Sequence, residues 1–138
     1  MAEESTGDAP AADLAARLAT LPERVNGDPW LVRRGRFLTV EVLIELGRVP
    51  YRLIIERGRV ASLEQGARPL RSWRVAFRAG EEVWRRFWRT EPAPQDHDLF
   101  ALTKRGELRI EGDLQPFMAN LFYFKDVLAA PRQRAGEG

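Results

Sequence analysis

The sequence predicts an α+β fold in which helices cover one face of a single β-sheet. Two observations support this prediction. Five segments have the apolar and polar alternation of strands, and the first three follow one another without a helical segment between them. The helical segments stand before and after this group of strands, and such segregation is typical of α+β proteins. The length of 138 residues suits one domain, expected over residues 10–130 with disordered ends at 1–9 and 131–138.

The strand segments reveal their inward faces through alternation. In the first of them, Val42 and Ile44 point inward, whereas Glu41 and Glu45 point outward. The fourth strand places Trp73 inward by the same reasoning. The five predicted strands span residues 37–46, 49–57, 60–64, 72–79 and 107–111.

Glycine and proline mark where the predicted elements begin and end. The pairs Gly47–Arg48 and Gly58–Arg59 are expected to form tight hairpin turns. An N-terminal helix is expected to begin near Pro10 and to end at Pro22. Asp28 followed by Pro29 is a helix-start signal for a further short helix.

The helical segment 81–89 has an apolar face and a basic face. The apolar face consists of Val83, Trp84, Phe87 and Trp88, and the basic face of Arg85, Arg86 and Arg89. Arginines beside tryptophans can form a nucleic-acid patch, but here the rings lie opposite the guanidinium groups. A solvated basic face is therefore the favoured interpretation, and contact with an anionic membrane surface is the alternative.

The final segment, from Gly106 to Leu128, is unusually apolar. It is expected to form a strand, a turn at Gly112, and one helix whose N-cap is Asp113. The predicted helical stripe consists of Leu114, Phe117, Met118, Leu121, Phe122, Lys125 and Leu128. A solvent-exposed helix would not carry this much apolar surface, so we expect it to cover either a solid core or a cavity.

Composition limits the possible functions. The chain has 44% hydrophobic and 30% charged residues, as soluble globular proteins do. It has no cysteine, which excludes disulfides and cysteine zinc sites. The net charge of +2 is spread along the chain and predicts no nucleic-acid partner. Without a leader or a long apolar run, we expect a cytoplasmic protein, and the preference for arginine over lysine favours a GC-rich, bacterial genome.

Candidates for catalysis are few. His97 lies between Asp96 and Asp98, which suggests either a carboxylate-oriented general base or an exposed loop histidine, and the second interpretation is favoured. Glu107 and Glu111 are expected on the outer face of the last strand. No nucleophile elbow, phosphate loop or dinucleotide motif is present. We therefore predict a protein that is not an enzyme and that holds no metal or cofactor.

The residues 101–121, ALTKRGELRIEGDLQPFMANL, resemble the C-terminal signature of the sterol carrier protein type 2 family. That signature is a short helix, Gly-Lys-Leu, a strand, Gly-Asp and a closing helix, and Glu107 replaces its usual lysine. The turn IERGRV and the segment WRVAFRAGEEVWRRFW are similar to the corresponding strands and helix of the family. The resemblance covers about residues 12–129.

This resemblance implies a five-stranded, mostly antiparallel sheet with helices on one face and a hydrophobic tunnel between the two layers. It implies non-catalytic binding, and intracellular transfer, of a lipid, fatty acyl chain or sterol. The implied tunnel lining is Val83, Trp84, Phe87, Trp88, Phe100, Leu102, Phe117, Met118, Leu121 and Phe122. The family's peroxisomal C-terminus is absent, so that compartment does not carry over.

Alternatives remain open at this stage. Trp84 and Trp88 are bulkier than the family usually has there and could plug the tunnel. The chain would then be an accessory or protein-interaction module with a filled tunnel. A more remote alternative is an enzyme that acts on an apolar substrate in the cavity. Expected partners are the apolar ligand, a transient membrane surface, and a second copy or a partner enzyme.

Overall fold

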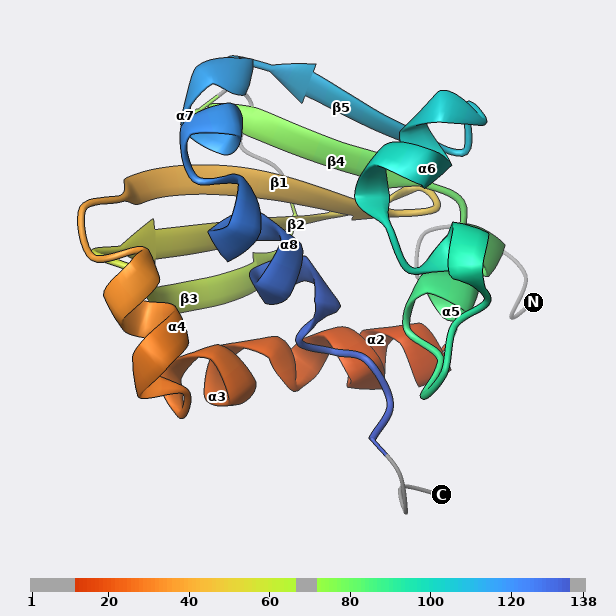
Figure 1. Ribbon diagram of the computed structural model, residues 1–138, viewed down its shortest axis with the longest axis horizontal. Helices are drawn as coiled ribbons and strands as arrows, with labels where there is room; N and C mark the ends of the chain where they lie inside the picture. Colours follow the sequence, from red (N-terminus) through yellow and green to blue (C-terminus); the bar gives the residue numbers. More distant parts are fainter. Residues whose placement is uncertain (1–11, 67–71, 135–138) are drawn as a thin grey trace.

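The computed structural model describes residues 12–66 and 72–134, so the segment 1–9 that we expected to be disordered lies outside the described residues. Five strands form one sheet in the order β3-β2-β1-β4-β5 (Figure 1). Their bounds are β1 Thr39–Leu46, β2 Val49–Glu56, β3 Arg59–Gln65, β4 Val75–Ala79 and β5 Leu108–Gly112. The pairs β1–β2, β2–β3 and β4–β5 are antiparallel, and β1–β4 is parallel. The prediction of a mostly antiparallel five-stranded sheet is confirmed.

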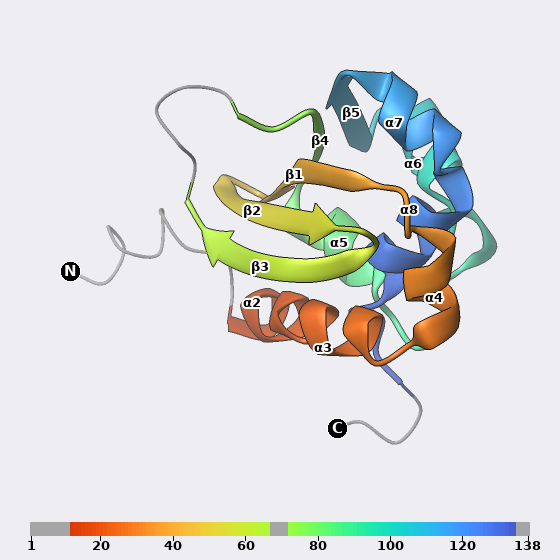
Figure 2. The ribbon, with the colours of Figure 1, turned by 90° about the vertical axis from the view of Figure 1, so that its left-hand side faces the viewer.

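Helices gather on one side of this sheet. They are α2 Ala12–Ala19, α3 Leu21–Asn26, α4 Pro29–Arg34, α5 Glu81–Phe87, α6 Leu99–Lys104, α7 Leu114–Ala119 and α8 Leu121–Ala129, with a short 3₁₀ helix, η1, at Pro94–Asp96. Figure 2 shows α4, α6, α7 and α8 along one side of the sheet, with α2 and α3 running beneath β3. The predicted α+β class is confirmed. None of the described helices is long and apolar enough to cross a membrane.

The covered face of the sheet forms the core. Val42 and Ile44 are fully buried, as their alternation predicted. The other face carries a ladder of charges, in which Arg78 bonds Glu45 at 3.0 Å and Glu111 at 2.8 Å. These pairs are partly exposed, so each contributes modestly to stability. The ladder makes this face unsuited to an apolar ligand.

Three predictions about element ends are wrong. Pro22 does not end a helix: the break falls at Thr20, and Pro22 lies in the first turn of α3, where its missing N–H costs no hydrogen bond. The second hairpin turn is Arg57–Gly58, one residue earlier than predicted, with φ of 53° and 83°. Positive φ at both central residues matches the twist of the flanking strands. The fourth strand begins at Val75 rather than at residue 72.

Trp73 lies outside the strand and does not follow its alternation. The guanidinium of Arg78 lies 5.5 Å from the centroid of the Trp73 ring. Arg78 belongs to the charged face, so Trp73 covers that face instead of entering the core. The prediction of an inward Trp73 is wrong, because Trp73 precedes β4, whose pairing with β1 and β5 begins at Val75.

The closing helix is two helices. Asn120 has φ −128° and ψ 40°, which separates α7 from α8 and changes the direction in which the next side chains point. The buried residues are Phe117, Tyr123, Phe124, Val127 and Leu128, whereas Leu114, Met118 and Phe122 are exposed. The single stripe predicted for this segment is therefore wrong. In one continuous helix the apolar side chains would have formed a single stripe. Because the helix breaks at Asn120, α7 and α8 each turn a separate set of side chains toward the core.

Residues 131–134 include two residues that bond to α5. The backbone N–H of Gln133 donates to the carbonyl of Trp88 at 2.8 Å, and Nε of Arg132 donates to the carbonyl of Phe87 at 3.0 Å. Both bonds reach the C-terminal end of α5. The part of the predicted disordered tail that the structure describes is thus attached to that helix.

Candidate apolar binding site

The residues expected to line a tunnel divide into a buried and a more accessible group. Those at most 3% exposed are Trp84, Phe87, Trp88, Leu102 and Phe117. Val83 and Leu121 are partly buried and pack against the core. Phe100, Met118 and Phe122 are 37%, 54% and 71% exposed. The ten predicted residues therefore lie in the helical layer, as expected, but they do not all face one space.

Trp84 and Trp88 form an anchored aromatic pair. Their ring centroids are 5.0 Å apart. The indole N–H of Trp84 donates to the carbonyl of Glu45 at 2.9 Å, and that of Trp88 donates to the carbonyl of Leu128 at 2.8 Å. The first bond ties α5 to the sheet and the second ties α5 to α8. Displacing either ring would break a buried hydrogen bond, so this part of the layer is held closed.

Phe117 is the centre of a second aromatic cluster, whose rings make no hydrogen bonds. Its ring centroid lies 5.5 Å from that of Phe77, 5.6 Å from Phe124 and 6.1 Å from Phe100. Phenylalanine has no hydrogen-bonding group, so these rings are held by packing, and Phe100 also by the Lys125 ammonium 5.0 Å from its ring centroid. We call this group (Phe77, Phe100, Phe117 and Phe124) the phenylalanine cluster.

The short helix α7 covers the phenylalanine cluster and is fixed by polar groups at its ends. At its start, Asp113 accepts from the backbone N–H of Gln115 at 3.1 Å and pairs with Arg74 at 2.9 Å. At its end, the Asn120 amide donates to the carbonyl of Pro116 at 3.0 Å. This confirms the predicted N-cap role of Asp113. Between these joints, α7 offers the cluster only apolar packing.

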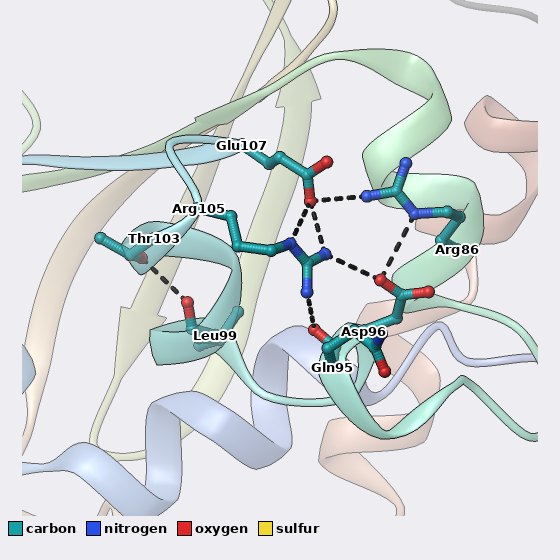
Figure 3. Close-up of polar contacts among 7 residues, drawn as sticks. All are labelled: Arg86, Gln95, Asp96, Leu99, Thr103, Arg105 and Glu107. Carbon is teal, nitrogen blue, oxygen red and sulfur yellow. Dashed lines mark hydrogen bonds and ion pairs between the residues drawn. The ribbon is translucent and has the colours of Figure 1, made fainter.

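A charge cluster joins α5, η1 and the segment before β5 (Figure 3). Glu107 accepts from Arg86 at 2.7 Å and from Nε of Arg105 at 3.1 Å. Asp96, which is 7% exposed, accepts from Arg105 at 2.9 Å and from Arg86 at 3.4 Å. Arg105 also donates to the carbonyl of Gln95 at 2.8 Å. The sequence does not predict this cluster, because its members belong to separate elements, α5, η1 and the connection between α6 and β5.

The charge cluster lowers the pKa of both carboxyl groups. The hydrogen bond from Arg105 is the main reason that the pKa of Glu107 lies below its usual value. Burial pushes the pKa of Asp96 upward, but the hydrogen bonds and charges of Arg105 and Arg86 outweigh it, so this pKa is also lowered. Both groups stay ionised and paired, which suits a structural clamp and not a proton-transfer role.

The two carboxylates next to His97 in the sequence are engaged elsewhere. Asp96 belongs to the charge cluster, and Asp98 accepts from the backbone N–H of Phe100 at 3.0 Å as the N-cap of α6. His97 itself is exposed. Within residues 12–66 and 72–134, no three histidine or acidic side chains are grouped as metal ligands would be. The geometry therefore supplies no oriented general base at this position.

Several surface hollows formed by described residues have charged walls. One of about 210 Å³ is lined by Glu45, Arg78, Glu107 and Arg109, together with glycines 47, 80 and 106 and Ala79. Another, of about 330 Å³, lies between α2 and α5 and is lined by Asp13, Arg17, Glu82 and Arg85 among others. Charged walls of this kind do not suit an apolar ligand. The phenylalanine cluster is thus the best candidate for an apolar site.

The arrangement of sheet and helices matches known structures. The crystal structure of sterol carrier protein 2 superposes with a TM-score of 0.67 over 87% of this chain and 96% of the other, at 11% identity. This chain has a sterol-carrier-like fold. The UbiJ-SCP2 ubiquinone synthesis protein gives a TM-score of 0.55 at 19% identity, over 83% of this chain and 93% of its own. A conserved hypothetical protein from Thermus thermophilus, described as possibly a sterol carrier protein, gives 0.56 at 11% identity, over 89% and 91%.

Sequence comparison adds no closer assignment. No protein-family model and no curated protein matches the chain. The identities to the similar structures are low, so the sterol-carrier-like likeness concerns the fold. The resemblance seen in residues 101–121 is consistent with that fold, since these residues form α6, β5 and α7 in the expected order.

Proposed function

We propose that this sterol-carrier-like chain binds a lipid, fatty acyl chain or sterol without converting it, and transfers it between sites in the cell. The ligand would enter between the sheet and α7–α8, where Phe117 and Phe124 now pack. The observation that carries this proposal is the contrast between the two aromatic groups. The tryptophans are hydrogen-bonded to the backbone, whereas the phenylalanine cluster is not.

Opening the layer costs least at the phenylalanine cluster. A ligand chain there replaces ring contacts by its own apolar contacts, so the buried apolar area is kept. Opening at the tryptophans would in addition leave the carbonyls of Glu45 and Leu128 without their donors. Leu121 and Met118 stand at the edges of α7 and α8, where they would contact a ligand that enters under α7.

The experiment is a titration with a fluorescent fatty acid, followed by displacement with natural acyl lipids and sterols. Leu121→Trp adds bulk at the entry and should weaken binding, whereas Phe117→Ala removes the central ring and should strengthen it. The second change should also destabilise the fold by about 3–5 kcal/mol, so unfolding must be measured in parallel. Trp84→Phe, at the anchored pair, is the matched control and should leave affinity unchanged. Absence of binding in both the wild type and Phe117→Ala would contradict the proposal.

A second function is favoured by the closed tryptophan pair. With both indoles hydrogen-bonded, the chain could serve as an accessory module whose core is simply filled. Such a module would bind no lipid, either as the wild type or as Leu121→Trp. Its affinity for a partner protein would be the same with and without fatty acids. Pull-down with and without added fatty acid separates the two functions.

A further inference from the structure

Large apolar side chains are exposed on one side of the molecule. Among the described residues, those that are large, hydrophobic and exposed are Trp30, Phe37, Phe100, Leu114, Met118 and Phe122. All six lie on α4, α6, α7 and α8 or in the connection that follows α4. These four helices occupy the same side of the sheet (Figure 2). We call this side the helical flank; its most exposed residues are Phe37 at 87% and Trp30 at 75%.

The helical flank is basic where its most exposed rings lie. Residues 29–38, PWLVRRGRFL, contain three arginines and no acidic residue. The guanidinium of Arg36 lies 4.5 Å from the Phe37 ring centroid, and one of its N–H groups donates to the carbonyl of Arg33 at 2.7 Å. Cations thus stand directly beside exposed aromatic rings.

The turn between β2 and β3 adds further positive charge at this place. Gly58 donates through its N–H to the carbonyl of Leu38 at 3.2 Å. A Cβ at Gly58 would overlap the carbonyl oxygen of Val32 and would lie 2.8 Å from the carbonyl carbon of Gly35, so the turn approaches the α4–β1 connection very closely. This approach brings the exposed Arg57 and Arg59 beside the basic segment 29–38.

Two acidic groups on the helical flank pair with cations, and two more, Asp28 and Glu56, are exposed beside the basic segment. They are outnumbered there by the arginines at positions 33, 34, 36, 57 and 59. Asp126 pairs with Arg34 at 2.5 Å, and Asp98 pairs with Lys125 at 3.5 Å. The flank therefore has an excess of positive charge around its exposed rings. The basic face of α5 differs in this respect, because Arg85 is bonded to Asp13 at 2.8 Å and Arg86 belongs to the charge cluster.

We propose that the helical flank docks onto an anionic lipid bilayer, with Trp30 and Phe37 at the headgroup level and Arg33 and Arg36 on lipid phosphates. Aromatic rings flanked by cations are the chemistry of membrane interfaces. A second copy of this chain would bring the same arginines to the contact, and like charges facing one another make it a poorer occupant here. This inference rests on exposure and charge and is independent of ligand binding. In this orientation α7 faces the bilayer. The membrane contact then lies on the helical flank and not on the basic face of α5, where the sequence had suggested it.

The test is flotation of the whole chain with vesicles of phosphatidylcholine, with and without phosphatidylglycerol. The wild type should bind only the anionic vesicles, and binding should weaken as salt is added. Reversing charge at Arg33 and Arg36 together (Arg33→Glu, Arg36→Glu) should lower the partition constant by roughly tenfold or more, at about one kcal/mol per cation. The matched control is Arg48→Glu with Arg89→Glu, at two positions away from the flank. This pair should change the partition constant much less.

The apolar contribution is tested separately. Trp30→Ala with Phe37→Ala should lower vesicle binding, and these exposed positions should leave the unfolding midpoint unchanged. Subtracting the fluorescence emission of Trp30→Phe from that of the wild type gives the emission of Trp30, whose maximum should shift to shorter wavelength on anionic vesicles. Equal binding to neutral vesicles, or no loss in either flank variant, would overturn the proposal. So would a dimer that dissociates on Trp30→Ala with Phe37→Ala while vesicles remain unbound.

Discussion

The hydroxyl of Tyr123 donates a hydrogen bond of 2.6 Å to the carbonyl of Gly58, which lies 65 residues earlier in the chain. The Tyr123 ring also lies against Gly35, where an added Cβ would be 2.7 Å from ring atom Cδ1. The final helix α8, the β2–β3 turn and the α4–β1 connection therefore meet at one buried contact. This junction fixes one end of the helical flank on the sheet.

Tyr123→Phe should lower the free energy of unfolding by about 1–3 kcal/mol, because the buried carbonyl of Gly58 loses its donor. Urea denaturation measures the change. Burial also raises the pKa of Tyr123 above its ordinary value of 10.0. Folding thus keeps the hydroxyl protonated, so wild-type stability should fall as pH rises above that value, where only the unfolded chain ionises. Burial also raises the pKa of Tyr51, but Tyr123 is the more deeply buried, so Tyr51→Phe should flatten the alkaline fall less than Tyr123→Phe does. If it flattens the fall as much, the assignment to Tyr123 is wrong.

Gly35→Ala should destabilise the fold by about 1–3 kcal/mol through overpacking against Tyr123. The φ of Gly35 is −98°, so the cost comes from the ring contact and not from backbone strain. Gly80→Ala is a suitable comparison, because nothing lies within 4 Å of its Cβ position. Because Gly80 is the N-cap of α5, where alanine is less favourable than glycine, Gly80→Ala should lower the thermal unfolding midpoint, but by less than Gly35→Ala does. Equal midpoints for the two variants would show that the Tyr123 ring can move aside.

Trp88→Phe should destabilise the chain by about 1–3 kcal/mol, since the buried carbonyl of Leu128 loses the indole donor. Chemical denaturation reports the loss. Trp30→Phe, at an exposed ring, should stay within about 0.5 kcal/mol of the wild type. If Trp88→Phe instead left stability intact, the tryptophan pair would not be an anchor, and the argument for ligand entry at α7 would lose its basis.

The charge cluster should make the fold sensitive to acid. Asp96 and Glu107 have lowered pKa values in the folded chain, so the unfolded chain takes up protons first as pH falls. The stabilising effect is complete above the ordinary values of 3.8 and 4.5 and is lost as pH drops below them. Glu107→Gln should reduce this acid dependence in urea titrations at several pH values. Glu91→Gln, an exposed control, should retain it.

Alternation was enough to predict most of the sheet. Val42, Ile44 and their neighbours on β1 are buried on one face, because a half-buried strand must separate apolar from polar side chains. Residues at strand ends were less predictable. Trp73 continues the apolar pattern of β4 in sequence, but the strand pairing begins only at Val75, so the alternation does not extend to Trp73.

The candidate site was harder to predict than the sheet. Nothing in the residues around Asn120 announces a break, since the apolar pattern runs on through α8, and helix breaks without proline or glycine depend on tertiary contacts. Pro22 was misleading for the opposite reason, because a proline suits the first turn of a helix as well as the position after one. The charge cluster of Asp96 and Glu107 depends on three-dimensional proximity, for which the sequence offers no periodic signal.

The single parallel pairing between β1 and β4 has a consequence for how the chain assembles. Strands β1, β2 and β3 are joined by tight turns, so their antiparallel pairs close short loops. Residues 42–46 must instead find residues 75–79 after the chain has passed through two other strands. Pairing of distant segments slows folding more than it affects stability. The β1–β4 pairing and the similarly distant β4–β5 pairing should therefore govern the folding rate, with strands β1 to β3 forming first and the second half of the chain adding to them.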